Sequence, residues 1–400
     1  MLASSIAAQC GASVLLLERN DVLGKKLRIT GKGRCNLTNN CSVNEVIENI
    51  PTGGRFLHGA LNGFTPRDAM SFFESLGVRL KTERGSRVFP QSDKAADVVD
   101  ALRRLMDKEG VTNRQARAIG IVSNSGKIIG VQTAGDDIIH CKSVILATGG
   151  MSYPATGSTG DGYNMACELG HTITPLRGSL VPLTAEPDVC VRMQGLTLKN
   201  VRLFVYDTGK RPVFEEFGEL LFTHFGLSGP LVLSASAHMR DFSSRKYYVN
   251  IDLKPALDEK KLDLRILRDF EKYSNRDFSN ALNDLLGRLM IPVIVEKSGI
   301  LPSTKVHSIS REQRLGLVRL LKALRIDVDS PRPVEEAIIT SGGVELREIN
   351  PKTMESKLVR GLFFAGEIID ADAYTGGFNL QIAWSTAYSA ARSAVEYAKR

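Results

Sequence analysis

Three glycine-rich segments hold the residue types that could bind a phosphate-containing ligand. The first, 24–36 (GKKLRITGKGRCN), mixes glycines with lysines and arginines. Such a segment suits a loop that wraps a pyrophosphate with backbone N–H groups and cationic side chains. A flexible basic loop is the alternative. Because Glu18, an acid suited to bind a ribose, lies shortly upstream, we favour the ligand-binding interpretation.

The second segment follows a predicted strand at 143–147 (SVILA) and begins with 148–150 (TGG). A glycine pair at the end of a strand lets the backbone pass close to a ligand. Further on, 160–162 (GDG) opens a predicted helix, and a helix N-terminus favours phosphate. An ordinary strand–turn–helix with Ser/Thr caps is the alternative.

The third segment begins with a predicted buried strand at 361–366 (GLFFAG), which delivers Gly366 and Glu367. A glycine pair at 376–377 then starts the final predicted helix. The positive end of that helix could face the electron-rich edge of a reduced flavin. A tight turn without a ligand is the alternative.

Few other residues are candidates for chemistry. His224, in the glycine-marked stretch 221–230 (LFTHFGLSGP), is the first candidate for catalytic proton transfer. His58 and His171 are weaker candidates, because an isolated histidine is more often a structural hydrogen-bonding residue. Cys35 has no resolving cysteine nearby and is interpreted as a small buried residue. The sequence contains no Walker A, HExxH or Ser-His-Asp pattern and no GxGxxG for a second dinucleotide.

Length and composition indicate a folded protein of two or three domains. The chain has 400 residues, of which 36 are glycine, with 43% apolar and 24% charged residues, so a disordered or fibrous chain is excluded. Six scattered cysteines without a CxxC pair predict neither a disulfide framework nor a metal site. No apolar run reaches the roughly 18–20 residues that cross a bilayer, and no basic segment opens a signal peptide, so we expect a cytoplasmic protein without membrane attachment.

The net charge of +8 could serve nucleic-acid binding or an anionic cofactor and substrate. The basic residues are dispersed and only one tryptophan is present. We therefore favour the small anionic ligand, with a nucleic-acid surface kept as the alternative.

The N-terminal elements predict part of a dinucleotide-binding βαβ unit. A helix of small residues at 2–10 precedes a buried apolar run at 14–17, which ends in Glu18. In such units the acid lies roughly 20 residues beyond the GxGxxG loop, so we expect the glycine loop just upstream of Met1. A start assigned downstream of the true one explains this better than a lost loop, because the helix at 2–10 is poorly placed as a free N-terminus.

Along the rest of the chain, segments with mixed helix and strand patterns alternate with segments rich in strand patterns. The patterns predict helices at 65–76, 95–109 and 378–397, a β-meander at 116–140, strands at 201–206, 231–234 and 247–253, a helix-rich stretch at 257–326, and a return to strand character at 334–346. The two ends share one texture, and the middle looks inserted.

Together these segments closely resemble one family, the BaiN/RdsA-type (YhiN-like) NAD(P)/FAD-dependent flavoproteins. The matching strings are LLLERNDVLGKKLRITGKGRCNLTN, VILATGGMSYPATGSTGDGYNMACELGHTITPL, GELLFTHFGLSGP and TSGGVELREINPKTMESKLVRGLFFAGEIIDADAYTGGFNLQIAWSTAY. They occur in family order along nearly the whole chain. The family's N-terminal strand and GxGxxG are absent here, which implies fewer contacts to the pyrophosphate.

The resemblance implies an α/β fold: a Rossmann-like FAD-binding domain built from both chain ends (1–179 and 347–400), an inserted β-barrel-like domain (180–256 and 328–346) and a small helical subdomain (257–327). It also implies the residues that line FAD, which are Glu18 at the adenosine ribose, Lys25, Lys26, Gly33, Arg34 and Asn36 along the cofactor, Thr148 and Gly149 close to it, Gly366, Glu367 and Asp370 at the pyrophosphate and ribityl, and Gly377, Asn379 and Leu380 near the isoalloxazine.

The resemblance further implies an NAD(P)H- and FAD-dependent oxidoreductase acting on CH–CH groups. The family's best-defined activity is reduction of conjugated C=C bonds in 3-oxo-4-ene and 3-oxo-4,6-diene bile acids by gut clostridia, and the chain resembles clostridial members. We therefore predict a small-molecule substrate, a bile acid or its CoA ester, with NADH or NADPH as transient electron donor. A tRNA-modifying flavoprotein, motivated by the charge and the helical insertion, and a flavin-binding module without turnover stay open.

Overall fold

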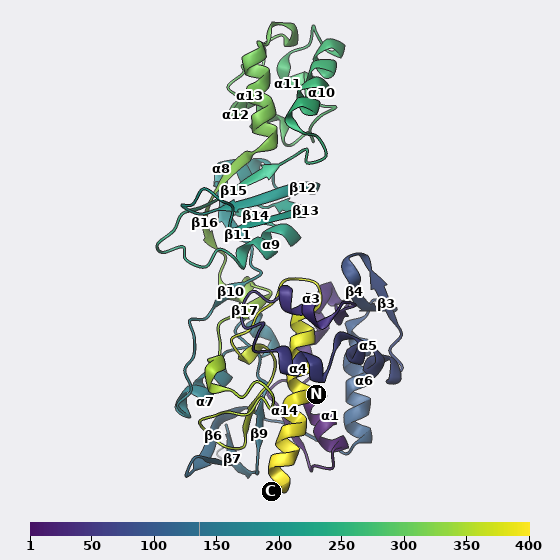
Figure 1. Cartoon of the computed structure of the whole chain (residues 1–400), viewed down its shortest axis with the longest axis vertical. Helices are drawn as coiled ribbons and strands as arrows, with labels where there is room; N and C mark the ends of the chain where they lie inside the picture. Colours follow the sequence, from purple (N-terminus) through teal and green to yellow (C-terminus); the bar gives the residue numbers. More distant parts are fainter. Residues whose placement is uncertain (136) are drawn as a thin grey trace. The chain divides into compact units, whose positions relative to one another are not determined.

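The computed structural model describes residues 1–135 and 137–400, which form two compact units (Figure 1). Unit 1 comprises Met1–Ser179 and Val334–Arg400, and unit 2 comprises Leu180–Pro333. Both chain ends therefore build one unit, and the other is inserted between them. The segment 334–346, predicted to belong with the inserted part, lies in unit 1.

Two pairs of parallel strands form the centre of unit 1. β1 (Leu15–Glu18) pairs with β5 (Thr112–Gln115), and β9 (Val144–Leu146) pairs with β18 (Leu362–Phe364). All three strands predicted here from apolar runs are confirmed, whereas β5 is fully exposed and carries no apolar pattern. Glu18 is the last residue of β1, and because β9 and β18 run in parallel, the glycine turns that follow them lie at one edge of that pair.

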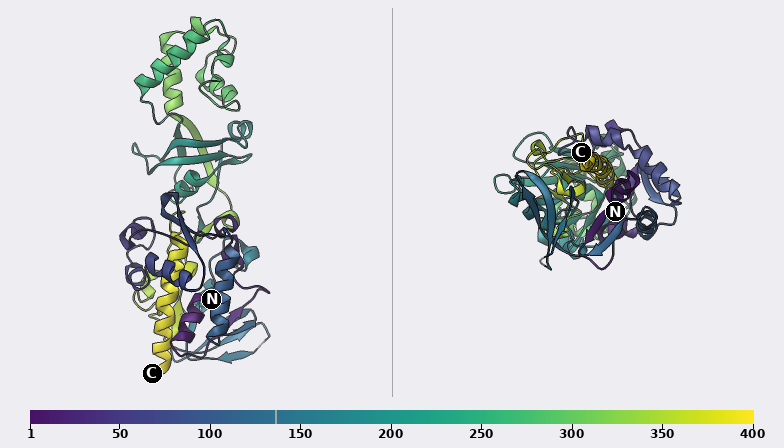
Figure 2. Two further views of the ribbon diagram at one scale, coloured as in Figure 1. Left: turned by 90° about the vertical axis from the view of Figure 1, so that its right-hand side faces the viewer. Right: turned by 90° about the horizontal axis from the view of Figure 1, so that it is seen from below.

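Three helices of unit 1 pack side by side, and the C-terminal one also contacts β9 and β18. α1 (Leu2–Gln9) lies beside both α6 (Ala95–Lys108) and α14 (Phe378–Lys399), as Figures 1 and 2 show. The buried face of α14 is rich in alanine, which lets α1 approach closely, and its Trp384 Nε1 donates to the carbonyl of Leu37 at 2.9 Å. The predictions of helices at 2–10, 95–109 and 378–397 are confirmed.

Smaller elements surround this centre. The remaining helices of unit 1 are α2 (Lys25–Ile29), α3 (Val43–Glu48), α4 (His58–Gly63), α5 (Pro66–Ser75) and α7 (Asp161–Glu168); the remaining strands are β2 (Thr38–Asn39), β3 (Leu80–Glu83), β4 (Arg87–Pro90), β6 (Ala118–Asn124), β7 (Lys127–Thr133), β8 (Ile138–His140), β10 (Arg177–Ser179) and β17 (Ile339–Ser341).

The predicted meander is confirmed as the antiparallel sheet β6-β7-β8, although its expected second turn includes residue 136, which lies outside the described residues. β2-β4-β3 and β10-β17 form two further antiparallel sheets. The segment 24–36, expected as a loop, instead contains α2, because its run of lysine, leucine and arginine has good helix propensity. The predicted strand character at 334–346 is limited to β17.

Unit 2 is built on a closed barrel of six antiparallel strands in the order β11-β14-β13-β12-β15-β16. These strands are β11 (Leu183–Ala185), β12 (Thr197–Tyr206), β13 (Phe214–Phe222), β14 (Gly226–Ser228), β15 (Tyr247–Asp252) and β16 (Leu324–Pro331). Alternate residues of β12 and β15 are fully buried, as expected for strands with one face toward the barrel interior.

Helices complete unit 2. They are α8 (Pro187–Arg192), α9 (Pro230–Ser236), α10 (Glu259–Lys272), α11 (Phe278–Ala281), α12 (Ile291–Ser298) and α13 (Arg311–Lys322). The strand predicted at 231–234 is wrong, since these residues form α9. Gly229 and Pro230 are a helix-start signal, and Leu231 packs against Gly218 of β13, so the apolar run plugs the barrel. The predicted α/β architecture with an inserted barrel and a helical subdomain is confirmed.

Among the described residues, no helix is long and apolar enough to cross a membrane.

Candidate functional site

A cavity of about 1270 Å³ opens in unit 1 along β1 and β9 and reaches their carboxyl ends. Its volume exceeds the roughly 300–1,000 Å³ usual for small-molecule pockets, so an extended ligand fits. Of the residues predicted to line FAD, the cavity brings together Glu18, Lys25, Lys26, Thr148, Gly149, Gly366, Glu367, Asn379 and Leu380. The first turn of α14 closes one side.

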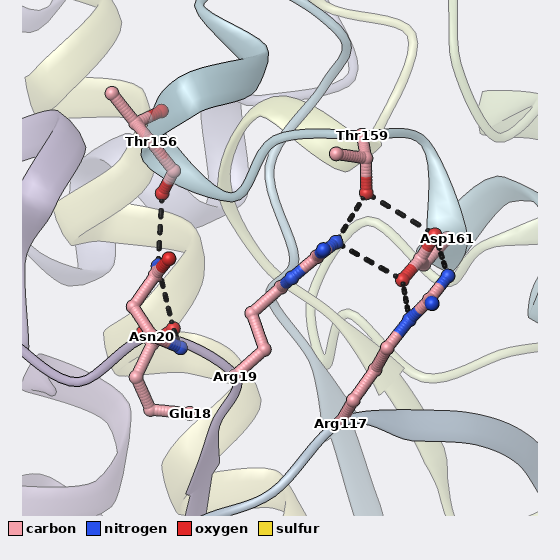
Figure 3. Close-up of polar contacts among 7 residues, drawn as sticks. All are labelled: Glu18, Arg19, Asn20, Arg117, Thr156, Thr159 and Asp161. Carbon is pink, nitrogen blue, oxygen red and sulfur yellow. Dashed lines mark hydrogen bonds and ion pairs between the residues drawn. The ribbon is translucent and has the colours of Figure 1, made fainter. Parts of the chain in front are cut away.

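Glu18 is held in place at the end of β1. The backbone N–H and the Nδ2 of Asn20 both donate to Glu18 Oε1, each at 2.9 Å, and Nδ2 also donates to the carbonyl of Thr156 at 3.0 Å (Figure 3). These bonds use one carboxylate oxygen and leave Oε2 able to accept from a ligand hydroxyl. The carboxylate is therefore preoriented for a ribose.

A cluster of charges ties the rim of the cavity together beside Glu18. Asp161, the first residue of α7, accepts from Arg117 at 2.8 and 3.1 Å and from Arg19 at 3.3 Å. Arg19 also donates to Thr159 Oγ1 at 2.6 Å (Figure 3). The hydrogen bond from Arg117 is the largest effect that holds the pKa of Asp161 below its usual value. The carboxylate of Asp161 therefore links the residue after β1, the residue before β6 and the start of α7.

A second ionic group joins the first and third glycine-rich segments. Lys26 Nζ lies 2.6 Å from Glu367 Oε2 and donates to Ser152 Oγ at 2.8 Å. The other oxygen of Glu367 accepts from the backbone N–H of Thr340 at 2.8 Å and from Ser152 at 3.1 Å. Lys26 and Glu367 are 24% and 13% exposed, so this pair is largely shielded from water.

Glycines are required where the backbone comes close to its neighbours. A Cβ on Gly162 would lie 1.9 Å from Thr148 Oγ1, and one on Gly150 would lie 2.3 Å from Thr340 Oγ1. Gly377, which precedes α14, has a φ of +99°, a region that favours glycine. Glycine turns, an oriented carboxylate and a helix N-terminus that lines the cavity are the donor and acceptor set of a dinucleotide site, so the residues present fit FAD.

The other predicted cofactor residues do not line this cavity, and their contact with FAD stays a prediction. Arg34 instead pairs with Glu83 and Asp93 and lies over the ring of Phe89, 4.1 Å from its centroid. Gly33 and Asp370 are not among the residues that line this cavity. The side-chain amide of Asn36 donates to the Thr38 carbonyl at 3.2 Å and accepts from the N–H of Gly377 at 3.0 Å, which fixes the start of α14.

The histidine candidates lie outside the cavity. His224 is exposed in unit 2, between β13 and β14, edge-to-face with Phe225. His171 is buried in unit 1, where its Nδ1 lies 3.1 Å from Glu348 and its Nε2 lies 2.8 Å from Ser356 Oγ. Burial lowers the pKa of His171, outweighing the neighbouring carboxylate. His171 is thus a structural residue, and a catalytic role for His224 stays a prediction.

Cys35 is fully buried, and burial raises the pKa of its thiol to about 12, which is consistent with the predicted structural role. Sequence reasoning missed Asn20, Arg117, Ser152 and Thr340. Asn20 follows the ribose acid by two residues, and that spacing could have identified it, because Asn side chains commonly bond backbone and acids at such turns. The other three are distant in sequence from their partners and gave no signal.

Comparison with known proteins identifies the family of this chain. A family model described as the HI0933-like protein Rossmann domain matches residues 1–393. The chain is 29% identical over 393 residues to the 3-dehydro-bile acid delta(4,6)-reductase of Clostridium scindens, covering 96% of this chain and 93% of that protein. It is 29% identical over 397 residues to the ribosomal RNA dihydrouridine synthase of Escherichia coli, covering 99% and 95%.

The same enzyme of Haemophilus influenzae is 30% identical over 401 residues, covering 96% of this chain and 93% of that protein. The family match spans nearly the whole chain, as does each relative. The resemblance noted from the sequence is therefore confirmed, and the chain belongs to the family of HI0933-like proteins with a Rossmann domain.

Proposed function

We propose that this protein uses NADH or NADPH to reduce a C=C bond conjugated with a carbonyl group, through bound FAD. The observation that carries the proposal is the cavity in which the oriented Glu18, the two glycine turns and the first turn of α14 converge. A bound flavin would supply hydride transfer, which the side chains themselves cannot perform.

The residues of the cavity would hold the cofactor at defined points. Glu18 Oε2 would accept the ribose hydroxyls, and the turns at 148–150 and 366–367 would bring backbone N–H groups to the pyrophosphate. The side chain of Asn379 clamps the turn before α14, because it both accepts from the N–H of Ala373 and donates to its carbonyl, each at 2.8 Å. These bonds fix the start of α14, so that the positive end of the helix would face negative charge on the isoalloxazine ring of reduced FAD.

The predicted substrate is a 3-oxo-4-ene or 3-oxo-4,6-diene bile acid, free or as its CoA ester. Support comes from the Clostridium scindens relative, whose name describes that reduction. A uracil ring in ribosomal RNA is a second candidate, supported by the names of the other two relatives. Both substrates contain a C=C bond conjugated with a carbonyl, so one flavin site could serve either.

The cofactor step is tested by titrating purified protein with FAD and then adding NADH or NADPH anaerobically. We expect a yellow protein that is bleached by one of the two donors. Glu18→Ala should weaken FAD binding, whereas Glu48→Ala, a change of an exposed acid on α3, should leave it unchanged. A protein that stays colourless with added FAD, or equal binding by both variants, would contradict the assignment of this cavity.

The substrate is then identified in parallel reactions with the same loaded protein. One reaction contains 3-oxo-4-ene bile acids and their CoA esters, with products followed by mass spectrometry. The other contains ribosomal RNA from a strain lacking dihydrouridine, digested and analysed for reduced uridine. Turnover in only one reaction selects that substrate, and donor oxidation without either product would overturn both.

A further inference from the structure

The outer face of the barrel in unit 2 carries an unusual set of side chains. Strand β12 alternates, with residues 201, 203 and 205 buried in the barrel, so Arg202, Phe204 and Tyr206 face outward. Opposite neighbours extend this face over three further strands. We name it the barrel patch, and it consists of Phe217 (β13), Arg202, Phe204 and Tyr206 (β12), Tyr248 (β15) and Arg325 (β16).

Rings and a guanidinium stack on one another in the barrel patch. Tyr206 and Tyr248 are opposite each other across β12 and β15, with ring centroids 5.1 Å apart and ring planes at 9°. The guanidinium carbon of Arg325 lies 4.0 Å from the centroid of the Tyr248 ring. Phe217, opposite Arg202 in the register, is 44% exposed. The patch thus offers flat aromatic and guanidinium surfaces on the outside of the barrel.

Cations gather at one end of the barrel patch. Lys210 and Arg211 lie in the turn between β12 and β13. An ion pair of 2.7 Å between Arg245 and Asp207 brings the loop before β15 to the same turn, and with it Lys246. Six basic residues of the patch and its two loops therefore come from four separate stretches of the sequence, namely Arg202, Lys210, Arg211, Arg245, Lys246 and Arg325.

The acids of this face do not neutralise it. Glu215 pairs with Arg202 at 2.9 Å, and Asp327 pairs with Arg325 at 2.7 Å. In the part of the chain that the structure describes, Lys210, Arg211 and Lys246 have no acidic partner. The surface therefore has an excess of positive charge next to stacked rings.

We propose that the barrel patch binds single-stranded RNA, with bases on the Tyr206–Tyr248 stack and phosphates at Lys210, Arg211 and Lys246. Aromatic platforms flanked by cations suit single strands, because every base has a flat face and every nucleotide carries a charge. An acidic protein would need no stacked rings, and a membrane surface would favour protruding apolar side chains over a flat stack. The proposal that the ligand is RNA rests on the second candidate function, reduction of uracil in ribosomal RNA. RNA binding to the barrel patch can nevertheless be measured without any catalysis.

The test uses the full chain loaded with FAD and a fluorescein-labelled, unstructured single-stranded RNA, with binding measured by fluorescence anisotropy at several salt concentrations. Lys210→Ala/Arg211→Ala should reduce the slope of log K against log salt by about 1.4, since each phosphate contact on a single strand contributes roughly 0.7. Tyr206→Leu should weaken binding roughly five- to 150-fold, the range for loss of one base stack, because Tyr206 ends the stack whereas Tyr248 lies between Tyr206 and Arg325.

Lys260→Ala/Arg319→Ala is the matched control, because it removes two exposed cations from α10 and α13, away from the barrel patch. We expect it to bind RNA as the wild-type chain does. Retained FAD and an unchanged melting temperature show that each variant is folded. Absent RNA binding, equal loss in the control, or stronger binding to anionic vesicles or an acidic protein would overturn the proposal. None of these outcomes depends on turnover, so failure here is distinct from failure of the flavin reaction.

Discussion

Replacing Gly162 with alanine tests whether the cavity depends on a close approach between α7 and the turn after β9. A Cβ at this position would lie 1.9 Å from Thr148 Oγ1 and 2.8 Å from Ile368 Cδ1, so both side chains must move. Alanine in place of a helical glycine otherwise stabilises by about 1 kcal/mol, whereas overpacking destabilises by about 1–3 kcal/mol. We expect a net loss of up to about 2 kcal/mol in the free energy of unfolding.

The same change should weaken FAD binding, because Thr148 lines the cavity. A displacement that costs about 1–2 kcal/mol corresponds to roughly five- to 30-fold in the dissociation constant, measured by quenching of flavin fluorescence. Gly316→Ala in α13 is the control, since a Cβ there meets nothing within 4 Å and should stabilise the protein. Gly162→Ala/Thr148→Ala should recover part of the loss, because it removes the clashing hydroxyl. Wild-type behaviour of Gly162→Ala, or a double variant as impaired as the single one, would refute the reasoning.

Three further outcomes follow from the packing of unit 1. Lys26→Met leaves the Glu367 carboxylate without its cation and should lower the free energy of unfolding by about 1–3 kcal/mol. Adding Glu367→Gln should reduce that loss, because the unpaired charge is removed. If chemical denaturation shows that the losses of the two changes simply add, Lys26 and Glu367 are not coupled. Gly377→Ala should cost at least about 2 kcal/mol, because φ is positive and a Cβ would lie 2.3 Å from a carbonyl of β2; Gly11→Ala, also at positive φ but in open space, should cost less in the same assay. Because burial lowers the pKa of His171, the unfolded chain takes up a proton more readily than the folded one as pH falls below neutral. The free energy of unfolding should therefore drop by at most about 1.4 kcal/mol per pH unit. If His171→Gln shows the same dependence of the free energy of unfolding on pH, His171 is not its cause.

Elements with strong periodicity could be predicted from the sequence, and short or polar ones could not. The amphipathic α6 and the long α14 differ from their predicted bounds by no more than two residues, because hydrophobic spacing alone defines them. β5 is exposed along its whole length, so only its pairing with β1 reveals it as a strand. The run 231–234 fits strand and helix equally, and the tertiary role of α9 as a plug decides between them.

The candidate site shows the same division. Glu18 could be predicted because an acid at the end of a buried strand is typical of a ribose-binding residue. The glycine turns could be predicted because glycine pairs mark backbone that adopts positive φ or passes close to a neighbour. Arg117 and Thr340 could not, because each meets its partner through the fold rather than through spacing. Adjacency across strands cannot be seen in a linear sequence, so the sequence alone presents the basic residues near the barrel patch as dispersed.

The short β10-β17 ladder has a consequence for how this architecture can evolve. The chain leaves unit 1 directly after β10 and re-enters just before β17, and Ser179 lies opposite Ile339 in the register. For unit 1, the whole insertion therefore takes the place of the loop in a β-hairpin formed by β10 and β17. Loop length adds little to the entropy of closing such a hairpin, so segments of very different size are tolerated at this point. A unit of this kind can in this way acquire, exchange or remodel its inserted module while its own core stays unchanged.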